Sequence, residues 1–203
     1  MDFNYENNKE RYTRGAGLLE NFLAKIRARK ADELIDEKSR KGRLLDIGCG
    51  SYPYFLSSID FKEKFGIDKN VKAYTNKGIN IKKHDIGRNE KLPYDSDFFD
   101  VVTLLAIIEH VNEKQAKELL KEVHRALKPG GKAILTTPTD KADIILRIMS
   151  KLFLVSSEEI DEHKQLYTSK ILREQLEYAG FKNDAIEIKS FEFGLNLIAS
   201  AEK

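Results

Sequence analysis

Short apolar runs alternate with helix-like stretches over most of the chain. Five of these runs predict buried strands, and the segments between them are long enough to hold helices. Near-continuous apolar strands separated by helices indicate a parallel sheet with helices on both faces, so the predicted fold class is α/β. The five expected strands are Arg43–Ile47, Lys64–Ile67, Asn80–Lys83, Phe99–Leu105 and Lys132–Thr137.

Helical spacing of apolar residues predicts further elements before, between and after these strands. Two more strand candidates, Ala185–Phe193 and Leu195–Ala201, are joined only through Gly194, which predicts an antiparallel hairpin. A short helix is also expected to begin near Pro53. The three longer expected helices run from about Gly17 to Asp36, from Asn112 to Leu127 and from Ser169 to Ala179.

Composition removes several classes of protein. The 203 residues hold 35 Lys and Arg against 33 Asp and Glu, which is a net charge of +2 and not the basic excess of a nucleic-acid binder. A single cysteine, Cys49, excludes a disulfide framework and a cysteine-rich zinc cluster, and no metal site is expected. No apolar run approaches the roughly 20 residues that span a bilayer. The N-terminal sequence MDFNYENNKE is no signal peptide, so a soluble, cytoplasmic protein is expected.

Small and acidic residues stand where three consecutive strands end. Gly48 and Gly50 allow the chain to turn tightly and to lie against a ligand. Asp68 follows the second strand, where a carboxylate can accept hydrogen bonds from a ribose diol, and Asp85 follows the third, where it can accept from an exocyclic amine. Asp68 alone is as readily a loop cap, and for Asp85 alone a structural role is slightly favoured. The three positions together predict a nucleoside pocket.

These motifs give the chain a clear resemblance to class I S-adenosylmethionine-dependent methyltransferases of the small, single-domain type. The resemblance covers roughly residues 43–203, and it implies a Rossmann-like seven-stranded sheet of order 3-2-1-4-5-7-6 whose last strand is antiparallel. It also implies S-adenosylmethionine as cofactor and S-adenosylhomocysteine as product. The segments that carry it are LLDIGCG, GID, HDI, LPYDSDFFDVVTLLAIIEHV, LLKEVHRALKPGGKAILTTP and HKQLYTSKILREQLEYAGF.

The resemblance also assigns cofactor contacts, position by position. Tyr52 stands where the family often has a third glycine, so an aromatic ring is expected beside the loop. The implied contacts are Asp46, Gly48, Cys49 and Gly50 beside the methionine part, Asp68 on the ribose, Asp85 and the Ile86 backbone on the adenine, and Leu105 and Ala106 beside the amino-acid portion. Cys49 is interpreted as a small packing residue, not as a nucleophile.

Methyl transfer from a sulfonium needs orientation and exclusion of water, and a general base only when the acceptor arrives protonated. His110 follows the fourth strand beside Glu109, either as a base or as part of a pair that caps the next helix and braces its loop, and the second interpretation is favoured. His163 and Tyr167 are four residues apart and would share a helical face, so they are further catalytic candidates.

One domain is expected over residues 1–203, in four segments: an N-terminal helical segment (1–42), a cofactor-binding half (43–138), an insertion (139–167), and the last helix with its hairpin (168–203). An apolar helix face within residues 141–155 predicts a lid over the active site. Pairing with a second subunit as a homodimer, or contact with a membrane surface, are its other possible roles.

The predicted activity is methyl transfer to a small-molecule or biosynthetic-intermediate acceptor, with a sugar- or lipid-linked acceptor as the narrower suggestion. A non-catalytic S-adenosylmethionine-binding module with the same fold is the alternative. The missing G-x-G-x-x-G pattern and the closing hairpin argue against a nicotinamide-dependent oxidoreductase. Charge balance and the sequence TLLAIIEH after the fourth strand argue against a nucleic-acid acceptor.

Overall fold

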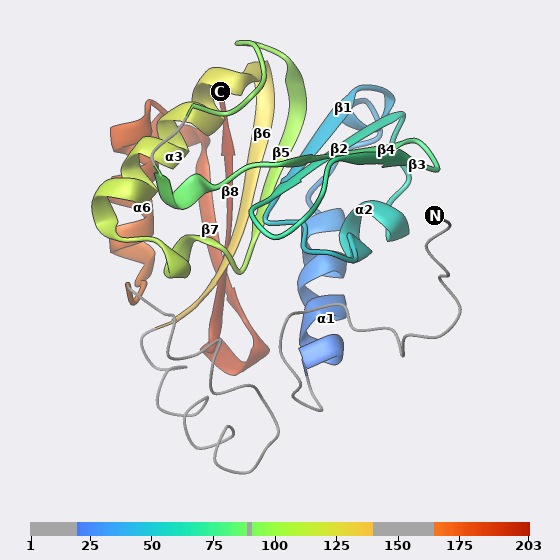
Figure 1. Cartoon of the computed structure of the whole chain (residues 1–203). Coiled ribbons are helices and arrows are strands. Elements are labelled where there is room, and N and C mark those ends of the chain that lie inside the picture. The colour runs from blue at the N-terminus through green and yellow to red at the C-terminus, as the bar shows by residue number, and fades with distance from the viewer. Residues whose placement is uncertain (1–19, 89–90, 140–164) are drawn as a thin grey trace.

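The computed structural model describes residues 20–88, 91–139 and 165–203, and their centre is one eight-stranded sheet (Figure 1). The strand order is β3-β4-β2-β1-β5-β6-β8-β7. β4, β2, β1, β5 and β6 are parallel, whereas β8 is antiparallel to both β6 and β7. The strands are β1 (Arg43–Ile47), β2 (Glu63–Asp68), β3 (Tyr74–Asn76), β4 (Ile79–Lys83), β5 (Phe99–Leu105), β6 (Leu127–Pro138), β7 (Ile186–Phe191) and β8 (Asn196–Glu202).

The order implied by the resemblance is confirmed, with one strand added at the edge. β3 pairs antiparallel with β4 through the turn at Lys77 and Gly78, whose φ angles are +47° and +77°. Two positive φ angles in a two-residue loop match the twist of a hairpin, and glycine supplies one of them without strain. This three-residue strand was not predicted, because Tyr74–Asn76 has no alternating apolar positions.

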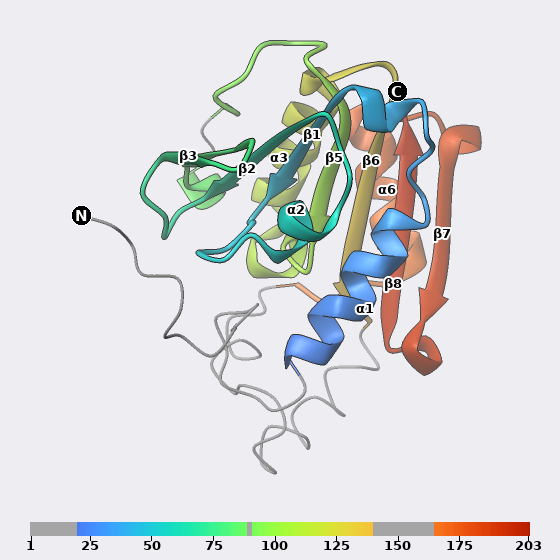
Figure 2. The same cartoon turned by 90° about the vertical axis from the view of Figure 1, so that its right-hand side faces the viewer.

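Helices cover both faces of the sheet, as predicted (Figure 2). α1 (Glu20–Asp32) and α2 (Tyr54–Ser58) lie on one face, and α3 (Glu113–Ala126) and α6 (Ser169–Ala179) lie on the other. α3 begins with a capping box, because the Asn112 side chain accepts from the Gln115 N–H while the Gln115 side chain accepts from the Asn112 N–H. The 3₁₀ turns are Ser39–Lys41, Ile86–Arg88, Ile108–His110, Asn183–Ala185 and Glu192–Gly194.

Two clusters of buried side chains lie on the two faces of the sheet. Alternation along β1 sends Leu44 to the cluster under α1 and α2, and Leu45 to the cluster under α3 and α6. Both residues are fully buried. Because the five parallel strands run in one direction, their carboxyl ends meet along a single edge of the sheet, at the lower side of Figure 1.

Two expected boundaries are wrong at the junction of α3 and β6. The predicted helix ends at Ala126, one residue early, and β6 begins at Leu127, five residues before the expected Lys132. Leu127 pairs with Phe99 of β5, and the register then shifts, so the turn that ends the helix already belongs to the sheet. His163, the apolar face within 141–155 and most of the insertion lie outside the described residues.

Candidate functional site

The loop after β1 turns at two glycines, Gly48 and Gly50, whose φ angles are +76° and +71°. A Cβ atom on Gly48 would overlap the Cδ1 atom of Ile107, which belongs to the loop after β5. The N–H groups of Gly48 and Cys49 both donate to the Ile67 carbonyl, at 2.8 and 3.2 Å. A side chain at position 48 would be strained at this φ and would force the Ile107 side chain to move, so glycine is favoured there, and the loop is fastened to the end of β2.

Cys49 packs inside this loop. The side chain is 7% exposed, and its Sγ atom lies 3.7 Å from the Gly50 carbonyl oxygen. Burial raises the pKa of the thiol, with the charges of Asp46 and Asp68 adding to the effect. A thiol that keeps its proton is a poor nucleophile, so this environment agrees with the packing role expected for Cys49.

Asp68 ends β2 with a buried and well-oriented carboxylate. Its Oδ2 atom accepts from the Gly50 N–H at 3.2 Å, and its Oδ1 atom accepts from the Asn70 N–H at 2.7 Å. A carboxylate oxygen has two lone pairs, and these two bonds fix the orientation of the carboxylate at the strand end. The bond to Gly50 joins the LLDIGCG segment to the GID segment in one site.

Asp46 lies one strand away, at the end of β1, and is 5% exposed. The hydroxyl of Thr103 on β5 donates to its Oδ1 atom at 2.6 Å. Burial raises the pKa of Asp46 to about 7; the nearby charge of Asp68 adds to this rise, and the Thr103 bond opposes it. We call Asp46 and Asp68 the acid pair. A cationic ligand would stabilise the ionised form of both carboxyls.

Asp85 and Ile86 lie at the end of β4, half-buried. The Asp85 carboxylate accepts from the Gly87 N–H at 2.9 Å and forms an ion pair with Arg88 at 3.4 Å. The Gln115 side chain, at the start of α3, donates to the Gly87 carbonyl. This contact joins the turn after β4 to the segment after β5, so two of the expected cofactor contacts approach the others along the same edge.

Leu105 and Ala106 form the end of β5 and the turn after it. Ala106 has a φ of +57°, a conformation that costs a residue with a Cβ about 1–2 kcal/mol. Its N–H donates to the carbonyl and the hydroxyl of Thr136 on β6, at 3.0 and 3.1 Å. These bonds hold the turn, which directs the chain across the end of the sheet toward His110.

Buried polar groups gather where this turn meets the segment before α6. The Tyr167 hydroxyl, fully buried, lies 3.4 Å from the Ile108 carbonyl oxygen, 3.1 Å from Gln165 Oε1 and 3.2 Å from Gln175 Oε1. We call these four groups the Tyr167 network. Burial and the Glu109 charge raise the pKa of Tyr167, so its hydroxyl remains a donor. Glu109 is 1% exposed and accepts from the Thr137 hydroxyl at 3.1 Å.

His110 is half-buried, and its backbone N–H donates to the Ile107 carbonyl at 3.1 Å. It therefore belongs to the turn that Tyr167 contacts through Ile108, while His163 lies outside the described residues. Sequence reasoning missed Thr103 and Gln175. Each is a polar residue at an apolar position of a strand or helix, and that is the signal that could have found them.

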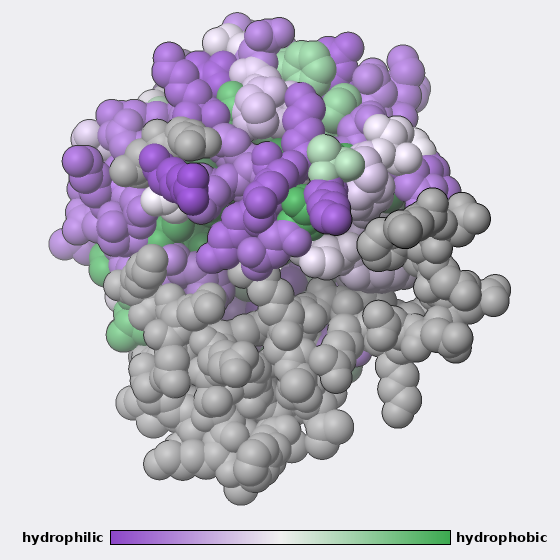
Figure 3. Space-filling model, in the orientation of Figure 1, coloured by the Kyte–Doolittle hydropathy of each residue, from purple (hydrophilic) through white to green (hydrophobic). Residues whose placement is uncertain are grey.

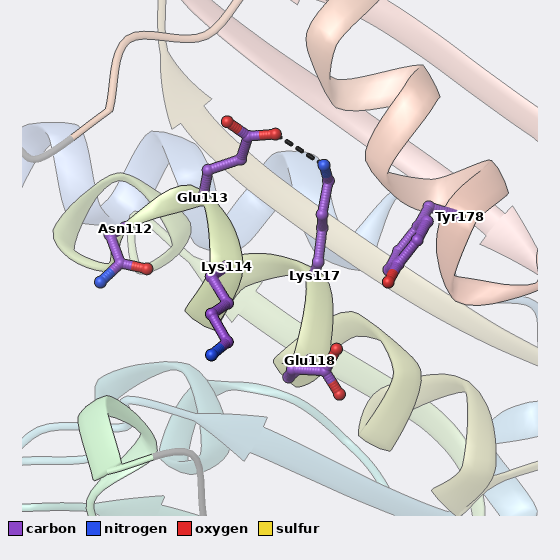
Figure 4. A pocket seen from close by; sticks show the side chains of 6 residues that line it. All are labelled: Asn112, Glu113, Lys114, Lys117, Glu118 and Tyr178. Atoms are coloured by element: carbon purple, nitrogen blue, oxygen red, sulfur yellow. Dashed lines mark hydrogen bonds and ion pairs between the residues drawn. The ribbon is translucent and has the colours of Figure 1, made fainter.

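A surface hollow of about 480 Å³ lies elsewhere, between α3 and α6 (Figure 4). Figure 4 shows Glu113 and Lys117 paired along α3, at 2.6 Å, with Tyr178 facing them from α6. The Lys121 ammonium lies 4.5 Å from the centre of the Tyr178 ring. Within the described residues, no group of three or more His, Cys, Asp or Glu side chains could hold a metal ion. No helix in the same ranges is long and apolar enough to cross a membrane.

Comparisons with known proteins agree with this geometry. A family model described as a methyltransferase domain matches residues 18–186. The demethylmenaquinone methyltransferase of Staphylococcus carnosus is 28% identical over 77% of this chain and 74% of its own length. The ubiquinone biosynthesis O-methyltransferase of Coxiella burnetii is 30% identical over 48% and 44%. The solved S-adenosylmethionine-dependent methyltransferase of Mesorhizobium loti superposes with a TM-score of 0.63, at 19% identity over 86% of this chain and 96% of that one.

Proposed function

Since this chain belongs to the class I S-adenosylmethionine-dependent methyltransferases, we propose that it transfers a methyl group to a small lipid-linked acceptor. The acid pair is the observation that carries the proposal, because two buried carboxyls at adjacent strand ends suit a cofactor with a sulfonium, an ammonium group and a ribose diol. The relatives named for demethylmenaquinone and ubiquinone biosynthesis favour a lipid-linked acceptor over a sugar-linked one.

The cofactor contacts follow from the positions of the strand ends. Asp68 binds the ribose hydroxyls, because its carboxylate is already oriented by Gly50 and Asn70. The Gly48–Gly50 backbone and Asp46 lie along the methionine part. Asp85 and the Ile86 backbone contact the adenine, and Leu105 and Ala106 flank the amino-acid portion. Bound S-adenosylmethionine supplies a methyl group that is already activated by the positive sulfur.

The protein's part in the reaction is orientation, exclusion of water and, for some acceptors, removal of a proton. An acceptor hydroxyl must lose its proton as its oxygen bonds to the methyl carbon and the carbon–sulfur bond breaks. We assign that proton to His110, because its turn follows β5 at the edge where the cofactor contacts meet. Tyr167 acts as a positioning residue through Ile108, and His163 stays a prediction from the sequence.

Calorimetric titration tests the cofactor assignment first. The purified chain is titrated with S-adenosylmethionine, with S-adenosylhomocysteine and, as a control, with NADH. Micromolar binding of the first two without binding of NADH is expected. Absence of binding by both sulfur compounds would overturn the proposal.

A non-catalytic cofactor-binding module remains the alternative function. A panel of polyprenylated phenols and quinols, incubated with methyl-labelled S-adenosylmethionine, distinguishes it. Cofactor binding with label transfer to a lipid-linked acceptor supports the enzyme, and binding without transfer to any member favours the module. We also propose that residues 1–203 form one domain and that the protein is cytoplasmic.

A further inference from the structure

Most of the large apolar side chains that the described residues expose lie at one end of the molecule. Four such side chains are exposed: Phe22 by 58%, Leu166 by 44%, Tyr178 by 52% and Phe193 by 106%. Tyr178 lies on α6 against Lys121 of α3, away from the strand ends. The upper part of the face in Figure 3 is largely hydrophilic, with small and separate apolar spots.

Phe193 and Leu166 lie beside the carboxyl end of β6. Thr139 follows that strand, forms a bridge with Tyr167, and donates its N–H to the Leu195 carbonyl at 2.9 Å. Its hydroxyl also donates to the Gly194 carbonyl at 3.1 Å. The segment that carries Leu166 is thus fastened to the tip of the β7–β8 hairpin, where Phe193 projects.

The hairpin tip holds Phe193 in a costly conformation. Glu192 and Phe193 have φ angles of +50° and +56°, a left-handed conformation that is strained for a residue with a Cβ atom. Glycine or asparagine would remove that cost, yet the position carries a fully exposed aromatic ring. Strain that presents an apolar side chain to the surroundings points to a binding role.

Helix α1 brings positive charge to the same end. Its first turn and the hairpin tip lie at one level in both Figure 1 and Figure 2. Phe22, Lys25 and Arg29 are all exposed, and their spacing of three and four places them on one helical face; Arg29 is paired with Glu33 at 3.7 Å, so Lys25 is the cation closest to Phe22 on that face. Burial raises the pKa of the Glu192 carboxyl, and Arg27 of the same helix lies close enough to oppose that rise.

We propose that Phe22, Leu166 and Phe193, here called the apolar rim, dock the protein on an anionic lipid bilayer. Separate apolar side chains that project beside cations suit the interface of a bilayer, where rings enter the headgroup region and cations meet anionic lipids. A protein partner would be favoured by one contiguous apolar patch instead. The rim borders the edge that holds the acid pair, so a lipid-linked acceptor can enter from the bilayer; only this purpose rests on the proposed function.

Co-sedimentation with vesicles tests the docking without any acceptor. Vesicles of phosphatidylcholine with phosphatidylglycerol are compared with vesicles of phosphatidylcholine alone, using the full chain. The intact protein is expected to bind the anionic vesicles more tightly and to be released by salt. Phe193→Ser should weaken binding by about tenfold, because one ring leaves the interface. Lys25→Gln should weaken it by about fivefold.

Tyr178→Ser is the control, since it removes a half-exposed ring (52%) from another face and should leave vesicle binding unchanged. Circular dichroism and S-adenosylmethionine titration of each variant show that the fold and the cofactor site survive. Failure of the intact chain to bind anionic vesicles, or an equal loss in Tyr178→Ser, would overturn the docking. The docking would also be overturned if the apolar rim joined two copies of the chain. Sedimentation velocity would then show a dimer that Phe193→Ser converts into a monomer. A chain that binds vesicles but no cofactor would overturn the proposed function alone.

Discussion

The acid pair and the Tyr167 network both bury polar groups at the edge where the parallel strands end, but they do so in opposite ways. Asp46 and Asp68 are acidic groups, and among the described residues the Thr103 hydroxyl donates to the first and the Gly50 and Asn70 N–H groups donate to the second. The Tyr167 network is neutral: its one hydroxyl proton lies within reach of the Ile108 carbonyl and of the side-chain oxygens of Gln165 and Gln175. A buried carboxylate gains from a cationic ligand, whereas a neutral network needs none. The first region is built to bind, and the second to hold the chain.

The two regions meet at Ile107 and Ile108. Gly48 leaves room for the Ile107 side chain on one side, and the Tyr167 hydroxyl contacts the Ile108 carbonyl on the other. The turn that carries His110 is therefore fixed by both regions. Substitutions in the two regions should change different measurements, and this separation can be tested.

The largest effect is expected for Gly48→Ala, at the point where the regions touch. A Cβ atom would overlap Ile107 and add strain at a positive φ, so the free energy of unfolding should fall by about 2–4 kcal/mol. Urea unfolding measures the change. Gly78→Ala is the control, because its φ is similar and no atom lies within 4 Å of the added carbon. Equal losses in both variants would show that the Ile107 contact contributes nothing.

Asp68→Ala should weaken S-adenosylmethionine binding by about 1–3 kcal/mol, from loss of charged hydrogen bonds to the diol. Isothermal titration measures it, with the exposed Asp60→Ala as a control for general charge effects. Wild-type affinity in a folded Asp68→Ala variant would remove the ribose role from this residue. The Tyr167 network should be unaffected by either substitution.

The raised pKa of Asp46 predicts that stability and cofactor affinity at the acid pair depend on pH, with no such dependence from the Tyr167 network. Its carboxyl keeps its proton in the folded protein up to about pH 7, whereas the unfolded chain loses it near pH 4. Its contribution to stability should therefore fall as the pH rises between these values. A cationic cofactor favours the ionised form, so affinity should rise about tenfold from pH 6 to pH 8. Titrations of Asp46→Asn should show a flatter profile, and an unchanged profile would assign the proton elsewhere.

The smallest effect is expected in the Tyr167 network. Tyr167→Phe removes the hydroxyl from the network and should lower the free energy of unfolding by about 1 kcal/mol, with little change in cofactor affinity. Tyr178→Phe, which removes an exposed hydroxyl, should stay within about 0.5 kcal/mol of the parent. If Tyr167→Phe abolished turnover without lowering stability, Tyr167 would be catalytic instead of positioning.

Local signals explain what the sequence predicted well. β1 and β5 have the expected bounds, because each is a short apolar run that ends at a turn or at a change of pattern. The acidic and glycine positions of the site were found for the same reason, since each lies at the end of a strand or within a few residues after it. β3 was missed because its three residues gain their place only by pairing with β4.

Partners far apart in sequence explain the rest. Thr103 and Asp46 are 57 residues apart, and only the register of β1 with β5 places the hydroxyl on the carboxylate. Tyr167 and Ile108 are 59 residues apart and meet only where the turn after β5 lies against the segment before α6. No local pattern marks either pair.

The sequence by itself determined the expected strands and the residues at their ends, because apolar periodicity and strand-end motifs are local properties of the chain, and the strand order followed from the family resemblance that those motifs carry. The tertiary structure alone decided the protonation, the packing and the backbone conformation of particular residues. Burial raises the pKa of Asp46, the position of the Ile107 side chain favours glycine at position 48, and the hairpin tip determines where Phe193 projects. Each of these depends on neighbours that only the folded chain brings together.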